Sequence, residues 1–416
     1  MNKKILIIGN SASAYALAKK ISENNNVFVA PGCDTINEFA TCIDIREDSE
    51  TELLEFVLEN DIDLTIPISK KTLETNIVEL FNTNGQNIFA PSLNSTNIIF
   101  DKNIMKKVLY KLRIPTPKFG IFEKQNMAAD YIKNIKTPFV IKTNEPASAT
   151  ILASPKTAKN ILDLYFSKKN QKVLIEDYVW GTPFAFYVIT DGYKALPMGS
   201  SILYKHSLEG DGGQLTSGMG ACCPNYKISL ENEYFIMDNV VYPLLEYLEQ
   251  NGTTYLGILS IQGILTEDGN IQVLSLEPFM QDADCSAILE LLDIDILKLV
   301  DACVLGSFSD EFNFIPQKDL SATSLVLISK NKEAIAGTIN GIKDLDENIK
   351  LAFFPTVTKN KYLEFEAKNG SVLVMTAIAS TVTSSRRKIY EEVENINFEG
   401  IAYRKDICKP VIEANL

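Results

Sequence analysis

The stretch KILIIGN, from Lys4 to Asn10, is a short apolar strand that ends in a glycine and an asparagine. It is followed at once by SASAYALAKKISE, residues 11–23, in which apolar residues recur at helical spacing. The same alternation continues through the first hundred residues, with strands expected in NVFVAP, IDLTIPIS and NIFAPS and helices near residues 50–60 and 71–83. This alternation predicts an open, mostly parallel βαβ sheet.

A second unit follows the proline-rich joint IPTPKFGIF at residues 114–122. The runs TPFVIKTN, ATILAS, KVLIEDYV and PFAFYVITDGYKALPM, with a helix near 156–168, indicate a small antiparallel sheet flanked by helices. The glycine-dense residues 209–224 predict an irregular loop. The remaining expected elements are a helix near 230–250, the strands LGILSIQGILT and NIQVLSLEP, a helix near 285–305, and a last unit of strands from about Leu320 with a helix near 383–394.

The length and composition fit a globular protein of several domains. A chain of 416 residues is too long for one core. We expect an N-terminal domain at residues 1–101, a central domain at 102–315 with a small lid at about 120–190, and a C-terminal domain at 318–416. The net charge of −13 argues against nucleic acid or an anionic membrane as a partner, and no apolar run reaches membrane-spanning length.

The seven cysteines show neither metal-ligand nor disulfide spacing. This predicts reduced thiols and a cytoplasmic location. The sequence leaves a monomer and a homodimer equally open.

The order of the segments resembles that of glycinamide ribonucleotide synthetase (phosphoribosylamine–glycine ligase), a family of ATP-grasp enzymes. The resemblance covers essentially the whole chain and is carried by LIIGN, VFVAPG, IDLTI, IFAPS, VIK, VLIEDYVWG, ALPM, SGMGA, YLGIL and YRKDI. It implies an α/β protein with an ATP-grasp fold, an N-terminal open parallel pre-ATP-grasp domain and a small C-terminal α+β domain. It also implies a reaction of purine biosynthesis on small-molecule substrates, in which ATP phosphorylates a carboxylate and an amine then displaces the phosphate.

The resemblance implies a nucleotide site. Lys102 and Lys142 match the two lysines that the family places on the phosphates of ATP. A lysine within the apolar strand FVIKTN is also explained by a side chain that reaches solvent from a strand end. The hinge segment, which would meet adenine through backbone groups, is Glu176, Asp177, Tyr178 and Val179.

The resemblance also implies positions for substrates and catalysis. The substrate-binding positions are Asn10, Thr216, Gly218, Met219 and Gly220. Lys205 and Asp282 occupy the catalytic positions, Lys205 being the residue kept from the family's Asp-His-Lys-Arg. His206 lies beside Lys205 and is the one histidine of the chain.

The stretch VLSLEPFMQDAD, residues 273–284, matches the metal-binding strand of the family. Because side chains alternate along a strand, Ser275 and Glu277 are expected on one face. The family has Glu, Asn and Arg where this chain has Ser275, Glu277 and Phe279. Glu277 is therefore the candidate ligand, for one Mg²⁺ at most. No arginine occurs between Arg113 and Arg386, so the lost arginine has no replacement within this part of the chain.

Three functions stay open on the sequence. The first is a divergent member of the family with the family's reaction, and the second is an ATP-grasp ligase for a different acid and amine. The third is a catalytically impaired paralogue that acts as a binding or partner protein. Two further departures favour the third: residues 181–183 read Gly-Thr-Pro where the family has an acid for the ribose, and the loop at 144–151 has lost the family's glycines.

Overall fold

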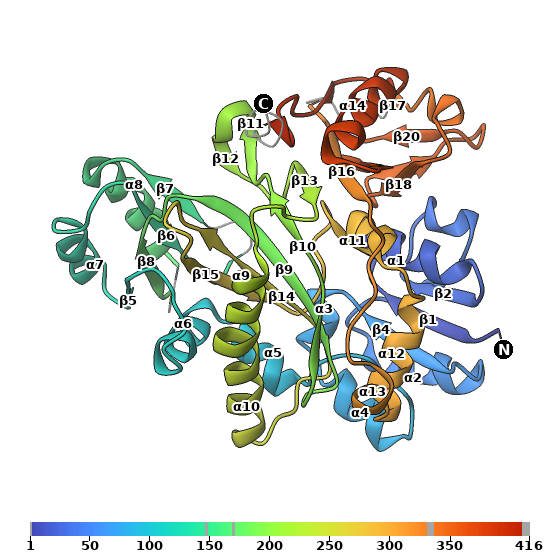
Figure 1. The fold of residues 1–416 in the computed structure, drawn as a ribbon, viewed down its shortest axis with the longest axis horizontal. Coiled ribbons are helices and arrows are strands. Elements are labelled where there is room, and N and C mark those ends of the chain that lie inside the picture. The colour runs from blue at the N-terminus through green and yellow to red at the C-terminus, as the bar shows by residue number, and fades with distance from the viewer. Residues whose placement is uncertain (1, 146–148, 169–170, 331–336, 410–416) are drawn as a thin grey trace.

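A computed structural model describes residues 2–145, 149–168, 171–330 and 337–409 (Figure 1). The N-terminal part is a four-stranded sheet whose strands run parallel, as the alternating pattern predicted, and their order is β3-β2-β1-β4. The strand expected in NIFAPS is reduced to one parallel bridge between Ile88 and Thr65, and the fourth strand is β3, which was not predicted. Its elements are β1 Lys4–Ile8, α1 Ala12–Ser22, β2 Asn26–Ala30, β3 Thr41–Cys42, α2 Glu50–Glu59, β4 Leu64–Pro67, α3 Lys70–Leu73, α4 Ile77–Thr83 and α5 Leu93–Phe100.

The helix expected at 71–83 is divided into α3 and α4. The carbonyl of Thr72 accepts hydrogen bonds from both the backbone N–H and the hydroxyl of Thr75, at 3.0 and 2.8 Å. A continuing helix would use that carbonyl for residue 76. The local threonine bonds therefore end α3 one turn after it starts.

A four-stranded antiparallel sheet forms the part of the molecule drawn at the left of Figure 1, in the order β5-β8-β6-β7. We call it the lid sheet. Its elements are β5 Phe119–Phe122, α7 Gln125–Ile132, β6 Phe139–Lys142, β7 Thr150–Leu152, α8 Pro155–Phe166 and β8 Val173–Asp177. Both helices bury apolar residues against the strands, Ala128 and Ile132 from α7 and Ala158 and Leu162 from α8.

The large central sheet has nine strands, with the main order β15-β14-β9-β10-β13-β16-β21-β18 and β22 paired to β16. These strands are β9 Thr182–Thr190, β10 Ala195–Leu203, β13 Gly220–Cys223, β14 Gly257–Leu265, β15 Ile271–Glu277, β16 Ser321–Ser329, β18 Ile349–Phe353, β21 Gly370–Ala379 and β22 Ile401–Ala402. The run PFAFYVITDGYKALPM was expected in the small sheet, and this was wrong. It forms β9 and β10, whose side chains are buried on both faces of the central sheet.

The central sheet continues through β13 into the C-terminal strands. Residues 209–224 were expected to be an irregular loop, but they contain β13 and the short strand β12 Gly212–Leu215. β13 pairs with β16 from Gly220 to Cys223. Gly220 permits this pairing, because a Cβ at that position would lie 2.6 Å from the carbonyl oxygen of Ser324.

The remaining elements are helices and the strands of two small sheets, β11-β12 and β17-β20-β19. They are α6 Lys102–Lys111, β11 His206–Leu208, α9 Leu230–Ile236, a π-helical turn Met237–Val241, α10 Tyr242–Gln250, α11 Cys285–Leu291, α12 Ile296–Leu305, α13 Phe308–Glu311, β17 Gly337–Thr338, β19 Val357–Lys359, β20 Phe365–Ala367 and α14 Val382–Glu392. The helix expected at 285–305 is two helices, because Asp295 caps a new one by accepting from the N–H of Leu297 at 2.9 Å.

One apolar core joins the N-terminal, central and C-terminal parts. Tyr15 of α1 contacts Phe39 and also Phe353 of β18, with ring centroids 5.0 and 5.5 Å apart. No helix in the described ranges is long and apolar enough to span a bilayer.

Candidate nucleotide and substrate site

A cleft of about 470 Å³ lies between the lid sheet and the central sheet. This volume is within the range of small-molecule sites. The lid side contributes Lys142 from β6, and the helix α6 contributes Lys102 from its first turn. The central sheet contributes Gln262 of β14 and Glu277 of β15, and Lys205 follows β10. Four predicted site residues thus converge on one cavity: Lys102, Lys142, Lys205 and Glu277.

A buried ion-pair cluster supports the lid side of the cleft. The Glu176 side chain is 1% exposed and binds the ammonium groups of Lys142 and Lys106, the latter at 3.1 Å. Burial alone would raise the pKa of Glu176, but the two ammonium groups outweigh it and hold the pKa below its usual value. Glu176 was expected only as part of a backbone hinge, and its side chain instead fixes Lys142.

Lys106 is a residue that the sequence interpretation missed. It is fully buried and also donates to the Thr116 hydroxyl at 2.5 Å. Burial lowers its pKa to about 8. The spacing contained a signal, because Lys106 lies four residues after Lys102 and so on the same face of α6.

Lys102 extends the positive cluster to the cleft. Its ammonium group donates to the carbonyl of Thr143 at 2.6 Å. Burial, and then repulsion by Lys142, lowers the pKa of Lys102 to about 8. The two cations lie close enough for the charge of one to affect the pKa of the other, which is a feature of functional sites. Glu145 of the neighbouring loop pairs with Lys168 on the surface, while Pro146 lies outside the described residues.

Ser275 and Glu277 both line the cleft, as the strand period predicted. Burial raises the pKa of Glu277, and the nearby Lys205, Lys70 and Lys102 partly oppose that rise. Among the described residues that line the cleft, Glu277 is the one carboxylate and none is an arginine.

Gln262 was also missed. Its Oε1 accepts a hydrogen bond from the ammonium group of Lys205, and the Ser275 hydroxyl lies 3.5 Å from the same atom. Because lysine can only donate, this contact turns the Gln262 amide nitrogen away from Lys205. That nitrogen is buried and has no hydrogen-bond partner within the described part of the chain.

A second cavity, of about 220 Å³, lies at the N-terminus of α1. Asn10 and Asp282 both line it, and Ser217 lines this cavity and the cleft. Asp282 accepts the backbone N–H of Ser13 at 2.8 Å, so its carboxylate also fixes the start of α1. The two cavities thus share a wall at Ser217 and Gln281.

The predicted substrate segment separates into two parts. Thr216 lines the cleft, and its hydroxyl donates to the carbonyl of Lys205 at 2.9 Å. A Cβ at Gly218 would lie 2.8 Å from the Cβ of Ala283, so glycine permits this close approach. Gly220 begins β13 and Met219 directly precedes it, with the N–H of Met219 donating to the carbonyl of Tyr204 at 2.7 Å. Their structural part is to hold the segment in place.

The hinge residues mark the exit from the lid sheet. β8 ends at Asp177, whose N–H donates to the carbonyl of Lys118 at 2.9 Å. Tyr178 and Val179 follow as part of the connection to β9. The ring of Tyr178 packs edge-on against that of Trp180, with ring centroids 4.8 Å apart. The segment therefore joins the two sheets that enclose the cleft.

Asp284 does not join the cleft. It is fully buried and accepts from the hydroxyls of Tyr187, at 2.8 and 2.9 Å, and Ser201, at 2.5 Å. Burial raises the pKa of Asp284 to about 6, and the hydroxyl donors and the charge of Lys205 only partly oppose that rise. Its oxygens are occupied by the protein, so we assign it a structural part.

An antiparallel lid over an antiparallel central sheet, with lysines from both sides facing one cleft, defines an ATP-grasp protein. Solved structures agree with this fold. The phosphoribosylamine–glycine ligase of Thermotoga maritima has a TM-score of 0.81 at 20% identity, covering 97% of this chain and 100% of that one. The biotin carboxylase of Campylobacter jejuni, solved as a complex with an ATP analogue, has a TM-score of 0.73 at 13% identity, covering 99% and 95%.

Sequence comparison assigns the family. The models of phosphoribosylglycinamide synthetase match in all three parts: the N domain at residues 3–98, the ATP-grasp (A) domain at 100–285 and the C domain at 329–410. The phosphoribosylamine–glycine ligase of Caldanaerobacter subterraneus is 30% identical over 97% of this chain and 99% of the relative. That of Clostridium acetobutylicum is 28% identical over 98% and 99%. The chain belongs to the phosphoribosylglycinamide synthetase family.

Proposed function

We propose that the protein is an ATP-dependent carboxylate–amine ligase of purine biosynthesis that joins glycine to phosphoribosylamine. The observation that carries this proposal is the convergence of Lys102, Lys142 and Lys205 on a cleft between lid and sheet. Three ammonium groups around one cleft are suited to binding the negative charges of a polyphosphate. The family and the relatives' names support the choice of acid and amine.

The reaction has two steps. A carboxylate oxygen of the acid attacks the γ-phosphorus of ATP, and the bond to ADP breaks. The amine nitrogen then attacks the acyl carbon, phosphate leaves with the C–O bond electrons, and the nitrogen loses a proton. This chain supplies Lys102 and Lys142 for the phosphates, and Lys205 for the negative charge that develops on transfer. Residues at the second cavity, Asn10 and Asp282 among them, would hold the amine donor.

The cleft fits one Mg²⁺. Ser275 and Glu277 place a hydroxyl and a carboxylate on one face of β15, and oxygen ligands of this kind suit the ion. With a single carboxylate, the remaining ligands would be phosphate oxygens and water. Magnesium would supply charge neutralisation between the phosphates, while Lys102 and Lys142 orient them.

The experiment is an ADP-release assay with purified protein, Mg²⁺ and ATP. We expect turnover that requires both glycine and phosphoribosylamine. No turnover with this pair, but turnover with another acid and amine, would transfer the proposal to a different ligase reaction.

A second candidate is a catalytically impaired paralogue, and the observation in its favour is that no arginine lines the described cleft. Stabilisation by Mg·ATP distinguishes a working nucleotide site from a lost one, since a ligand at a hundred times its Kd stabilises by about 2.7 kcal/mol. Binding without turnover on any acid and amine would select the paralogue.

The seven cysteines are all unpaired. We infer from them a reducing compartment, the cytoplasm.

A further inference from the structure

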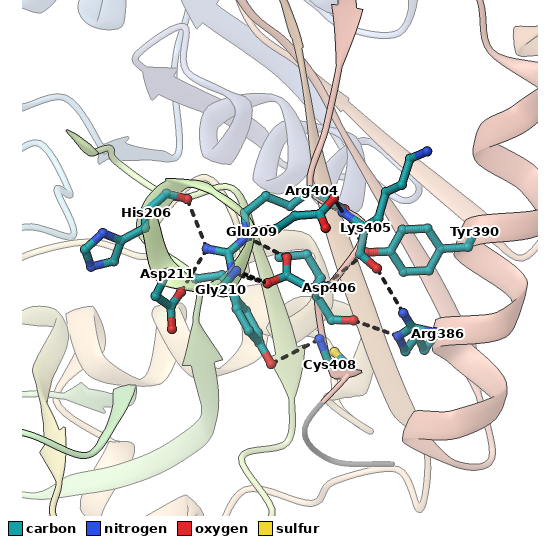
Figure 2. Close-up of polar contacts among 12 residues, drawn as sticks. His206, Glu209, Gly210, Asp211, Arg386, Tyr390, Arg404, Lys405, Asp406 and Cys408 are labelled. Atoms are coloured by element: carbon teal, nitrogen blue, oxygen red, sulfur yellow. Dashed lines mark hydrogen bonds and ion pairs between the residues drawn. The ribbon is translucent and has the colours of Figure 1, made fainter. Parts of the chain in front are cut away.

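The hairpin formed by β11 and β12, residues 206–215, meets the C-terminal segment 404–408 at one buried arginine (Figure 2). Arg404 is 2% exposed. It donates to both oxygens of Asp406 at 2.8 and 2.7 Å, to the Asp211 carboxylate at 2.9 Å and to the His206 carbonyl at 3.0 Å. A planar guanidinium makes this set of bonds and an ammonium does not.

Two backbone contacts reinforce the arginine. The N–H of Gly210 donates to Asp406 at 2.8 Å, and the N–H of Lys405 donates to Glu209 at 3.3 Å. We call Arg404, Asp406, Asp211 and Glu209 the clasp. It joins the tip of the hairpin to the C-terminal segment by charge-assisted hydrogen bonds, in which each of the two segments supplies both donors and carboxylate acceptors.

The C-terminal segment is itself fixed from its other side. Arg386 of α14 donates to the carbonyls of Ile407 and Lys405 at 3.0 and 2.9 Å. The Tyr390 hydroxyl, from the same helix, donates to the carbonyl of Arg404 at 2.8 Å (Figure 2). The clasp therefore anchors the hairpin to the C-terminal part of the molecule.

The base of the same hairpin forms a wall of the nucleotide cleft. Lys205 precedes β11 and Thr216 follows β12, and both line the cleft. The N–H and hydroxyl of Thr216 donate to the carbonyl of Lys205 at 2.7 and 2.9 Å. Arg404 donates a hydrogen bond to the carbonyl of His206, the next residue after Lys205. This contact is therefore one residue away from the lining of the cleft.

We propose that Arg404 is a positioning residue, which holds Lys205 and Thr216 in the cleft wall through the hairpin and thereby couples the C-terminal part to nucleotide affinity. The inference rests on the proposed function of the cleft. Without the guanidinium, the carboxylates of Asp211, Asp406 and Glu209 would face one another with no countercharge. Their repulsion would push the hairpin away from the C-terminal segment. Lys205 and Thr216 would then no longer be held in the wall of the cleft.

The test measures binding of a non-hydrolysable ATP analogue with Mg²⁺ by calorimetry and the hydrogen exchange of hairpin amides 207–216, in the full chain. Arg404→Met removes every hydrogen bond of the clasp that the guanidinium donates. Because that arginine is buried, the double variant Glu209→Gln, Asp211→Asn weakens the clasp from the exposed hairpin side alone, by removing both carboxylate charges of the hairpin. The matched control is Asp346→Asn, which breaks the Asp346–Lys388 ion pair of the same C-terminal part, 2.7 Å long, without touching the hairpin.

We expect analogue affinity about tenfold weaker for Arg404→Met and severalfold weaker for the double variant, with faster exchange confined to the hairpin. The control should match the wild type in both measurements. Folded clasp variants with wild-type affinity and wild-type exchange would overturn the inference. If the wild type itself does not bind the analogue, the proposed function fails, and the coupling fails with it.

Discussion

At the scale of single residues, the ion pairs of Glu176 with Lys106 and Lys142 are the contacts whose loss we expect to lower the free energy of unfolding most. Glu176→Gln would leave the buried Lys106 and the partly buried Lys142 without this counter-ion. Removing one member of a buried ion pair costs about 3–5 kcal/mol. We expect a drop of that order in the free energy of unfolding, measured with denaturant. The control is Glu123→Gln, which breaks the exposed Glu123–Lys172 pair beside the same lid sheet and should leave the midpoint unchanged.

Asp284 gives a pH dependence of stability. Its pKa is raised from 3.8 to about 6 in the folded protein, so between these values the folded state holds a proton that the unfolded state has lost. Its contribution to stability therefore falls as pH rises from about 4 to about 6, by about 3 kcal/mol. Asp284→Asn removes the titration. The difference in unfolding free energy between wild type and variant should change across this window, and a difference that is constant with pH would contradict the assignment.

Glu277 tests the metal site. Glu277→Ala removes the one described carboxylate of the cleft, so magnesium should no longer increase affinity for ATP. Calorimetric titrations with ATP in the presence of Mg²⁺ and of EDTA provide the comparison within one variant. Persistence of the magnesium effect would remove Glu277 from the ligand set.

At the scale of elements, β13 is the strand that connects β10 to β16 and so keeps the central sheet continuous. Gly220→Ala would place a Cβ against the carbonyl of Ser324, the residue before its register partner Leu325 in β16. The clash should cost more than about 1 kcal/mol of unfolding free energy. Gly269→Ala is the matched control, because its φ is also positive but a Cβ there meets nothing within 4 Å. Equal losses in both variants would show that backbone strain alone acts at Gly220.

The elements also show how far sequence patterns reach. The parallel strands of the first sheet, the lid helix α8 and the common face of Ser275 and Glu277 follow from local periodicity, and the structure has them. The breaks after Leu73 and Leu291 escaped prediction, since each depends on a side chain that competes for one backbone group. The sequence also did not predict that β9 and β10 belong to the central sheet, because the apolar pattern of a strand does not specify the sheet in which it pairs.

At the scale of the whole molecule, one sheet crosses the sequence boundary at residues 315–318. β16, the first strand of the C-terminal part, pairs on one side with β13. A fragment of residues 318–416 expressed alone would expose that edge and the apolar surface that packs on α1 and α11. We expect it to be unfolded or aggregated by circular dichroism and size-exclusion chromatography, under conditions in which the full chain is folded. A cooperatively folded, monomeric fragment would contradict this view of the sheet.

The sequence by itself determined the family, the parallel N-terminal sheet and which side chains share a face of each strand, because these depend on residue order and on periods of two or 3.6. Only the tertiary structure decided that Glu176 binds two lysines, that Gln262 holds Lys205, and that Arg404 reaches a hairpin almost two hundred residues away. Each of these joins residues far apart in the chain. Such contacts arise from the packing of complete elements, and no local pattern encodes them.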